Sequence, residues 1–162
     1  MEDKIIIQKG ASADTRSADH VISEKELVEA TEMHIRDVAQ VMVWFAEKLE
    51  LAGYRHDWTK IRHIAEFYEQ FHHDQETGKG DWMENPNGWY RSIHLVKERH
   101  HLSNGCPEDV DLLDVLEQIA DGVTAGMARS GEYKQAPISK ELLEKAYNNT
   151  VKKLLDAIEV KE

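Results

Sequence analysis

Apolar side chains recur at helical spacing through most of this chain, and this period constrains the fold more than any other feature. Stripes near a period of 3.6 residues run through five segments, and glycine, proline or asparagine turns separate these segments. A helix with one apolar stripe must bury that stripe against another element. The sequence therefore predicts an all-α fold, a single-domain bundle of about five main helices.

The expected helices have recognisable starts and stops. Ser23 followed by Glu26 has the pattern of a capping box, and Gly53 is expected to stop the first helix. The helices are expected over about residues 23–52, 57–72, 89–101, 107–131 and 139–158. Residues 1–22 are expected to form an extended or flexible segment, in which residues 5–7 could add a short strand. Residues 23–162 would then form the helical domain.

Charge and composition exclude several classes of protein. The net charge is −11 with no cluster of Lys and Arg, which excludes a binder of nucleic acid polymers. No apolar run approaches the roughly 20 residues that span a bilayer, and no signal peptide is visible, so we expect no membrane association. The single cysteine, Cys106, excludes an internal disulfide framework and favours a cytoplasmic location.

The adjacent pair His56 and Asp57 is the first candidate for chemistry, in a chain with nine histidines. An imidazole nitrogen and a carboxylate oxygen can bind the same divalent ion. The pair follows the expected break at Gly53, where one helix gives way to the next and neighbouring side chains can converge. In the alternative interpretation, Asp57 is an N-cap and His56 is incidental.

Two further residues could complete a metal shell. His34 lies in phase with the apolar stripe of the first helix and is expected to point inward, although a core histidine bonded to a carbonyl would do the same. Asp121 lies in an apolar setting between Ile119 and Val123, and an ionised aspartate is costly to bury without a partner. A metal ion or Arg129, two turns further on, would supply that partner; a solvated acidic face is the alternative.

The third expected helix carries a row of possible ligands. His94, Glu98 and His101 stand at i, i+4 and i+7, which places them on one helix face and points His100 elsewhere. A charged surface strip would show the same spacing. Lys60, one turn after Asp57, could bind a phosphate as a point charge, or it could be an ordinary solvated lysine.

The order His34, His56-Asp57, Asp121 resembles the HD-domain superfamily of metal-dependent phosphohydrolases. Residues 56–60 resemble the His-Asp-x-x-Lys form of its central motif, and the likeness covers about residues 27–130. The resemblance implies a mostly α fold with the site in a cleft between helices, and hydrolysis of a phosphate ester, often of a nucleotide. It also implies that the first ion is held by His34, His56, Asp57 and Asp121.

The resemblance extends to a second ion and to catalytic roles. His94 with either His100 or His101 would hold the second ion. One or two divalent ions (Mn, Mg, Co, Fe, Ni or Zn) would lower the pKa of bound water. Lys60 would contact the phosphate, with Arg129 as an additional contact that the family pattern does not require. Asp57 or an outer carboxylate, Glu98 or Asp114, would accept a proton.

Two other functions remain open from the sequence. Some members of the same superfamily use a His/Asp set for a di-iron centre and oxidise a substrate carbon, and the extra histidines allow this. A non-catalytic acidic module that binds a partner protein is the third hypothesis. The expected partner of an enzyme is a small phosphorylated substrate such as a nucleotide. A homo-oligomer is also possible, with Trp82 and Trp89 as exposed aromatic residues at its interface.

Overall fold

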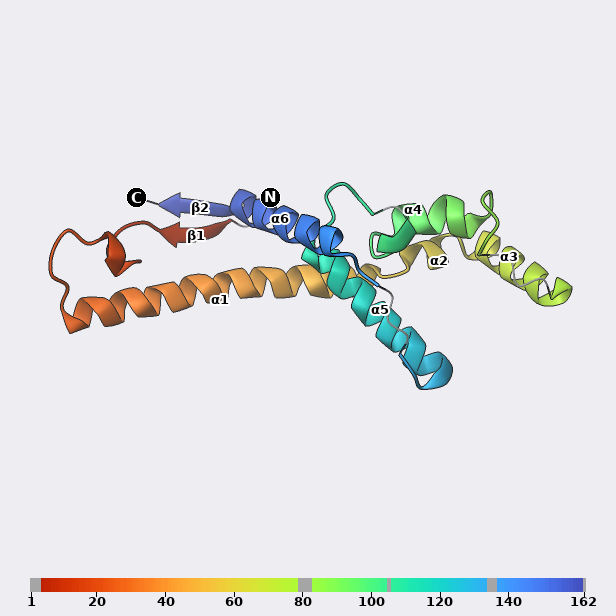
Figure 1. Cartoon of the computed structure of the whole chain (residues 1–162), viewed down its shortest axis with the longest axis horizontal. Helices are drawn as coiled ribbons and strands as arrows, with labels where there is room; N and C mark the ends of the chain where they lie inside the picture. The colour runs from red at the N-terminus through yellow and green to blue at the C-terminus, as the bar shows by residue number, and fades with distance from the viewer. Residues whose placement is uncertain (1–3, 79–82, 105, 134–136, 162) are drawn as a thin grey trace. The chain divides into compact units, whose positions relative to one another are not determined.

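The computed structural model of this chain describes residues 4–78, 83–104, 106–133 and 137–161. It is 68% helical, which confirms the all-α class. The α-helices, in chain order, are α1 (Glu24–Arg55), α2 (Trp58–Arg62), α3 (Ile64–Thr77), α4 (Leu95–Lys97), α5 (Leu112–Ser130) and α6 (Lys140–Ala157) (Figure 1). None of these described helices has the length and apolar character that a membrane crossing requires.

The chain divides into two compact units, residues 1–50 with 151–162, and residues 51–150. In the first unit, strand β1 (Ile5–Gln8) pairs in parallel with strand β2 (Ile158–Lys161), and Ile5 is buried (Figure 1). A strand at residues 5–7 was expected, but β2 was not: the last helix was expected to end at about residue 158, where β2 begins. The predicted domain boundary after residue 22 stays a prediction.

The first helix begins as expected and ends later. The Ser23 backbone N–H donates to Glu26 Oε2 at 2.8 Å and the Glu26 N–H donates to Ser23 Oγ at 3.3 Å, which confirms the capping box. Gly53 does not stop the helix, which continues to Arg55. The direction changes instead at Asp57, whose φ of 56° lies in the left-handed region. Asp57 occupies the N-cap position of α2, as the alternative interpretation expected, but its side chain makes no capping hydrogen bond.

The core of the second unit lies where the loop after α4 meets α5 and α6. Its buried and partly buried members are Leu102, Val110, Val115, Ala146, Cys106, Leu112, Ile138 and Leu142. Helix α5 starts at Leu112, later than the expected start at Pro107. The reason is a capping box: the Asp111 carboxylate accepts from the Asp114 N–H, and the Asp114 carboxylate accepts from the Asp111 N–H.

The segment expected as one helix over residues 89–101 is broken. A π-helical turn (η2, Tyr90–His94) leads into the short α4, and Glu98 has an extended backbone. The i, i+4, i+7 face predicted for this segment is therefore wrong. Trp89 is only 3% exposed, so it is not the expected surface aromatic residue, and Trp82 lies outside the described residues. Helix α3 also runs beyond the expected loop start, to Thr77.

Candidate metal centre

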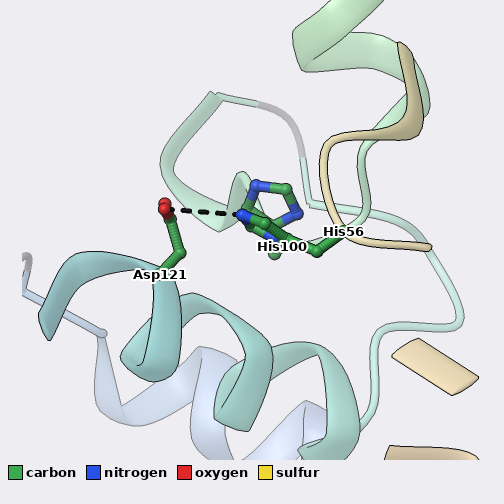
Figure 2. A group of neighbouring side chains, drawn as sticks. All are labelled: His56, His100 and Asp121. Atoms are coloured by element: carbon green, nitrogen blue, oxygen red, sulfur yellow. Dashed lines mark ion pairs between the residues drawn. The ribbon is translucent and has the colours of Figure 1, made fainter. Parts of the chain in front are cut away.

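His56 and Asp57 lie at the junction between α1 and α2, within the second unit. The His56 Nε2 atom is 3.5 Å from Asp57 Oδ2 and 3.5 Å from Asp121 Oδ1 on α5. Figure 2 shows the His56 and Asp121 side chains directed at each other, with the His100 ring beside His56. The Lys60 ammonium forms an ion pair with Asp57 Oδ2, one turn further along α2. The junction thus brings the predicted pair together with Asp121.

The chain turns after α4 and directs three imidazoles at the same region. His94 Nε2 lies 3.4 Å from Asp57 Oδ1, and His100 Nε2 lies 3.8 Å from that oxygen. His101 Nε2 is 2.8 Å from His94 Nε2. His94 and His100 are almost completely buried, with exposed fractions of 0% and 1%. Four imidazoles and two aspartates therefore form one cluster.

Three polar atoms inside this cluster lack a hydrogen-bond partner among the described residues. They are Asp57 Oδ1 and both ring nitrogens of His100, and all three are buried; His100 Nδ1 lies 3.1 Å from Glu117 Oε1 but outside hydrogen-bond geometry. An unsatisfied buried polar group is costly, so such atoms call for an explanation. Ligand atoms about 2.1 Å from a common ion are roughly 3.0–3.4 Å apart, close to the separations of 3.4–3.8 Å found around Asp57 Oδ1. The spacing fits a bound cation.

Three sets of side chains have one ligand atom each within 4.8 Å of one another. They are His56, His100 and Asp121; Asp57, His100 and His101; and Asp57, His94 and Glu98. Asp57 and His100 each appear in two of these sets. The donors therefore fit one ion or two neighbouring ions that share ligands.

Glu117 on α5 contacts the Nδ1 atoms of two of the imidazoles and thereby orients their rings. Its Oε1 atom is 3.0 Å from His56 Nδ1 and 3.1 Å from His100 Nδ1. A carboxylate that accepts from one ring nitrogen directs the other nitrogen toward a metal, an arrangement common at metal centres. Burial raises the pKa of Glu117, but hydrogen bonds from His100 and His56 outweigh burial and lower it overall. Glu117 is therefore ionised and acts as an acceptor.

The charge states of the cluster suit a cation. Burial lowers the pKa of His94 to about 3 and that of His101 to about 4, with neighbouring histidines adding to the effect. Both rings are therefore neutral at pH 7, the form that binds metals. Burial raises the pKa of Asp57, but Lys60 and the nearby histidines lower it overall, so Asp57 is ionised. Burial lowers the pKa of His100, while Glu117 raises it by more.

Not every predicted site residue joins this cluster. His34 belongs to the first unit, where it lines a pocket of about 180 Å³ with residues 13–16, 30 and 31, and its role as a ligand stays a prediction. Arg129 Nε donates to the Ala125 carbonyl of its own helix at 3.0 Å, and its phosphate contact also stays a prediction. Asp114, one expected proton acceptor, is bonded to Arg99 at 2.8 Å instead.

Residue patterns alone pointed only weakly to three residues that lie in or beside the cluster. His100 was directed away because an unbroken helix was assumed. Glu117 stands one turn before Asp121 on α5. The carboxylates Asp114, Glu117 and Asp121 follow one another at i, i+3 and i+7, and this row was a usable signal. Thr59 carried no signal, yet its Oγ1 lies 2.7 Å from His94 Nδ1 and 2.6 Å from Glu98 Oε1.

Most of the chain matches the model of a known protein family. Residues 23–159 match DUF5662, a family of unknown function. The chain belongs to this family. The matched DUF5662 region contains the whole cluster, from His56 to Asp121, and the described helices α1 to α6. No curated protein and no solved structure matches the chain.

Proposed function

We propose that this DUF5662 protein is a metal-dependent phosphohydrolase that cleaves a phosphate ester of a nucleotide or a related small molecule in the cytoplasm. The observation that carries the proposal is that buried atoms without a hydrogen-bond partner, Asp57 Oδ1 and both ring nitrogens of His100, lie inside a cluster of four imidazoles and two aspartates. The resemblance of residues 56–60 to the HD-domain motif supports the same reaction class.

The donor set favours some metals over others. Imidazole nitrogens suit Mn, Fe, Co, Ni and Zn, whereas Mg prefers oxygen ligands and water. Four imidazoles, His56, His94, His100 and His101, therefore make Mg the poorest fit among the expected ions. The chemistry that a bound divalent ion supplies is polarisation of a phosphoryl oxygen and a lower pKa of bound water.

Lys60 and Asp57 supply the chain's own contribution. The Lys60 side chain is 33% exposed, so its ammonium can reach a substrate phosphate while it stays close to Asp57. A lysine acts there as a point charge that offsets the negative charge of the phosphate. The ionised Asp57 carboxylate lies within the cluster and can accept a proton from a reacting water.

Metal binding is the first test of the proposal. Metal-free protein is titrated with Mn²⁺, Fe²⁺, Co²⁺ and Zn²⁺, and bound metal and thermal stability are measured. His100→Ala and Asp121→Ala should each weaken binding by at least the roughly 10–100-fold that loss of an outer partner causes. His73→Ala, at an exposed position on α3, is the matched control and should bind normally. Normal binding by both cluster variants would contradict the metal centre.

Activity is tested with a panel of phosphate esters, nucleotides first. Lys60→Met keeps the apolar stem of the side chain and removes its charge. It should leave metal bound and raise KM for the phosphate ester. Unchanged KM and kcat in this variant would remove the role assigned to Lys60. Bound iron with oxygen-dependent turnover and no ester hydrolysis would instead support the di-iron oxygenase, and absence of metal binding would support the interaction module.

A further inference from the structure

Thr59 connects His94 to a buried carboxylate. Thr59 is fully buried at the start of α2, and its Oγ1 atom lies 2.7 Å from His94 Nδ1 and 2.6 Å from Glu98 Oε1. The Thr59 backbone N–H also donates to Glu98 Oε1, at 2.8 Å. The extended backbone at Glu98 places this carboxylate behind the His94 ring.

The single proton of the Thr59 hydroxyl determines which atom donates in each hydrogen bond. Glu98 Oε1 already accepts from the Thr59 N–H, so it also acts as the acceptor for the Thr59 hydroxyl. A hydroxyl has one proton, and after donating it the Oγ1 atom can only accept from His94. The His94 proton therefore lies on Nδ1. In the neutral form of this ring, the Nε2 atom then carries a lone pair.

The tautomer of His94 determines that of His101. The two Nε2 atoms are 2.8 Å apart, a hydrogen-bond distance at which two lone pairs would repel each other. Without a metal, His101 must therefore carry its proton on Nε2 and donate it to His94. His100 Nε2 differs, because it has no hydrogen-bond partner among the described side chains.

We infer that Thr59 is a positioning residue that, with Glu98, fixes the Nδ1-protonated tautomer of His94. His94 Nε2 is thereby left to accept a hydrogen bond from His101 Nε2 in the metal-free protein. This inference rests on the proposed metal centre for its consequence. A first ion would be held by His56, His100 and the two aspartates, where Nε2 atoms already face carboxylates. A second ion at His94 and His101 would require the His101 proton to move from Nε2 to Nδ1, so the two positions should fill in order.

The tautomers can be measured without metal or substrate. Long-range ¹H–¹⁵N correlation spectra of the metal-free full chain report which ring nitrogen of each histidine carries the proton. We expect the proton on Nδ1 of His94 and on Nε2 of His101. Thr59→Ser keeps the hydroxyl and should give the same result. Thr59→Val keeps the shape and the backbone bond to Glu98 but removes the acceptor, so His94 should lose its preference for Nδ1.

These spectra can overturn the inference directly. A wild-type spectrum with the His94 proton on Nε2 contradicts it, even if no variant folds. A Thr59→Val spectrum identical to that of the wild type contradicts the role of Thr59.

Calorimetric titration with Mn²⁺ tests the order of filling. We expect two steps in the wild type and in Thr59→Ser. In Thr59→Val we expect the Mn²⁺ dissociation constant of the weaker step to change by roughly 10–100-fold, with that of the tighter step unchanged. A change confined to the tighter step contradicts the assignment of the second position. Correct tautomers with no Mn²⁺ binding would refute the proposed function and leave the positioning role of Thr59 intact.

Discussion

The contact between Arg99 and Asp114 should anchor the loop that carries His100. Arg99 Nε donates to Asp114 Oδ1 and Arg99 Nη2 donates to Asp114 Oδ2, both at 2.8 Å. The Asp114 Oδ2 atom also accepts from the Asp111 N–H at 2.9 Å. Both oxygens are therefore acceptors. In Asp114→Asn the amide NH₂ must face a donor in either orientation.

The size of the effect follows from burial. Asp114 is 5% exposed, whereas the Arg99 side chain is 41% exposed and solvent screens part of the pair. Breaking a fully buried ion pair costs roughly 3–5 kcal/mol, so we expect a loss of about 2–3 kcal/mol for Asp114→Asn. Asp109, the other carboxylate on Arg99, has a side chain that is 63% exposed. Asp109→Asn should cost below about 1 kcal/mol and is the matched control.

Thermal unfolding of the metal-free protein, followed by circular dichroism, measures both variants. At roughly 2–4 °C per kcal/mol for a chain of this size, Asp114→Asn should lower Tm by about 4–12 °C. Metal affinity should fall as well, because His100 follows Arg99 directly in the sequence. Equal Tm values for Asp114→Asn and Asp109→Asn would refute the reasoning, since burial is the main difference between the two contacts.

Two further predictions concern pH and packing. The pKa values of His94 and His101, about 3 and about 4, lie below the roughly 6.5 of an unfolded histidine. The contribution of the two neutral rings to the free energy of unfolding is therefore fully present above pH 6.5 and is lost as pH falls toward 4. The raised pKa of His100 offsets part of this, and equal urea midpoints at pH 7.5 and 5 would contradict the prediction. In α5, Gly126→Ala would place Cβ 2.7 Å from a backbone oxygen beyond the helix, whereas at Gly122 the nearest atom is 3.5 Å away. Gly126→Ala should therefore destabilise, and Gly122→Ala should stabilise by up to about 1 kcal/mol; a reversed order of Tm values would contradict this.

Local patterns in the sequence predicted much of this structure. The helical period predicted the all-α class, and the capping box at Ser23 predicted the start of α1. The convergence of His56-Asp57 with Asp121 followed from a motif at a helix junction and an aspartate in an apolar setting. The helical period and the capping box depend on residues that are close in sequence, and each half of the His56-Asp57 and Asp121 set carries its own local signal, which is why the patterns reveal them.

Contacts between distant residues account for the differences. The break after α4 places His100 at the centre, and it depends on Glu98 binding the backbone and side chain of Thr59, 39 positions earlier. No local signal marks that contact. The strand β2 likewise pairs with β1, more than 150 positions earlier, and no local pattern at residues 158–161 indicates a strand.

The parallel pairing of β1 with β2 has a consequence for biosynthesis. Ile5 pairs with Ile158, so β1 leaves the ribosome long before its partner strand β2. Until β2 is made, three consecutive isoleucines, Ile5, Ile6 and Ile7, have open backbone groups along an apolar strand, the kind of edge on which aggregation begins. A chaperone that shields emerging chains would therefore matter most for the segment around β1, and overproduction without one would favour inclusion bodies.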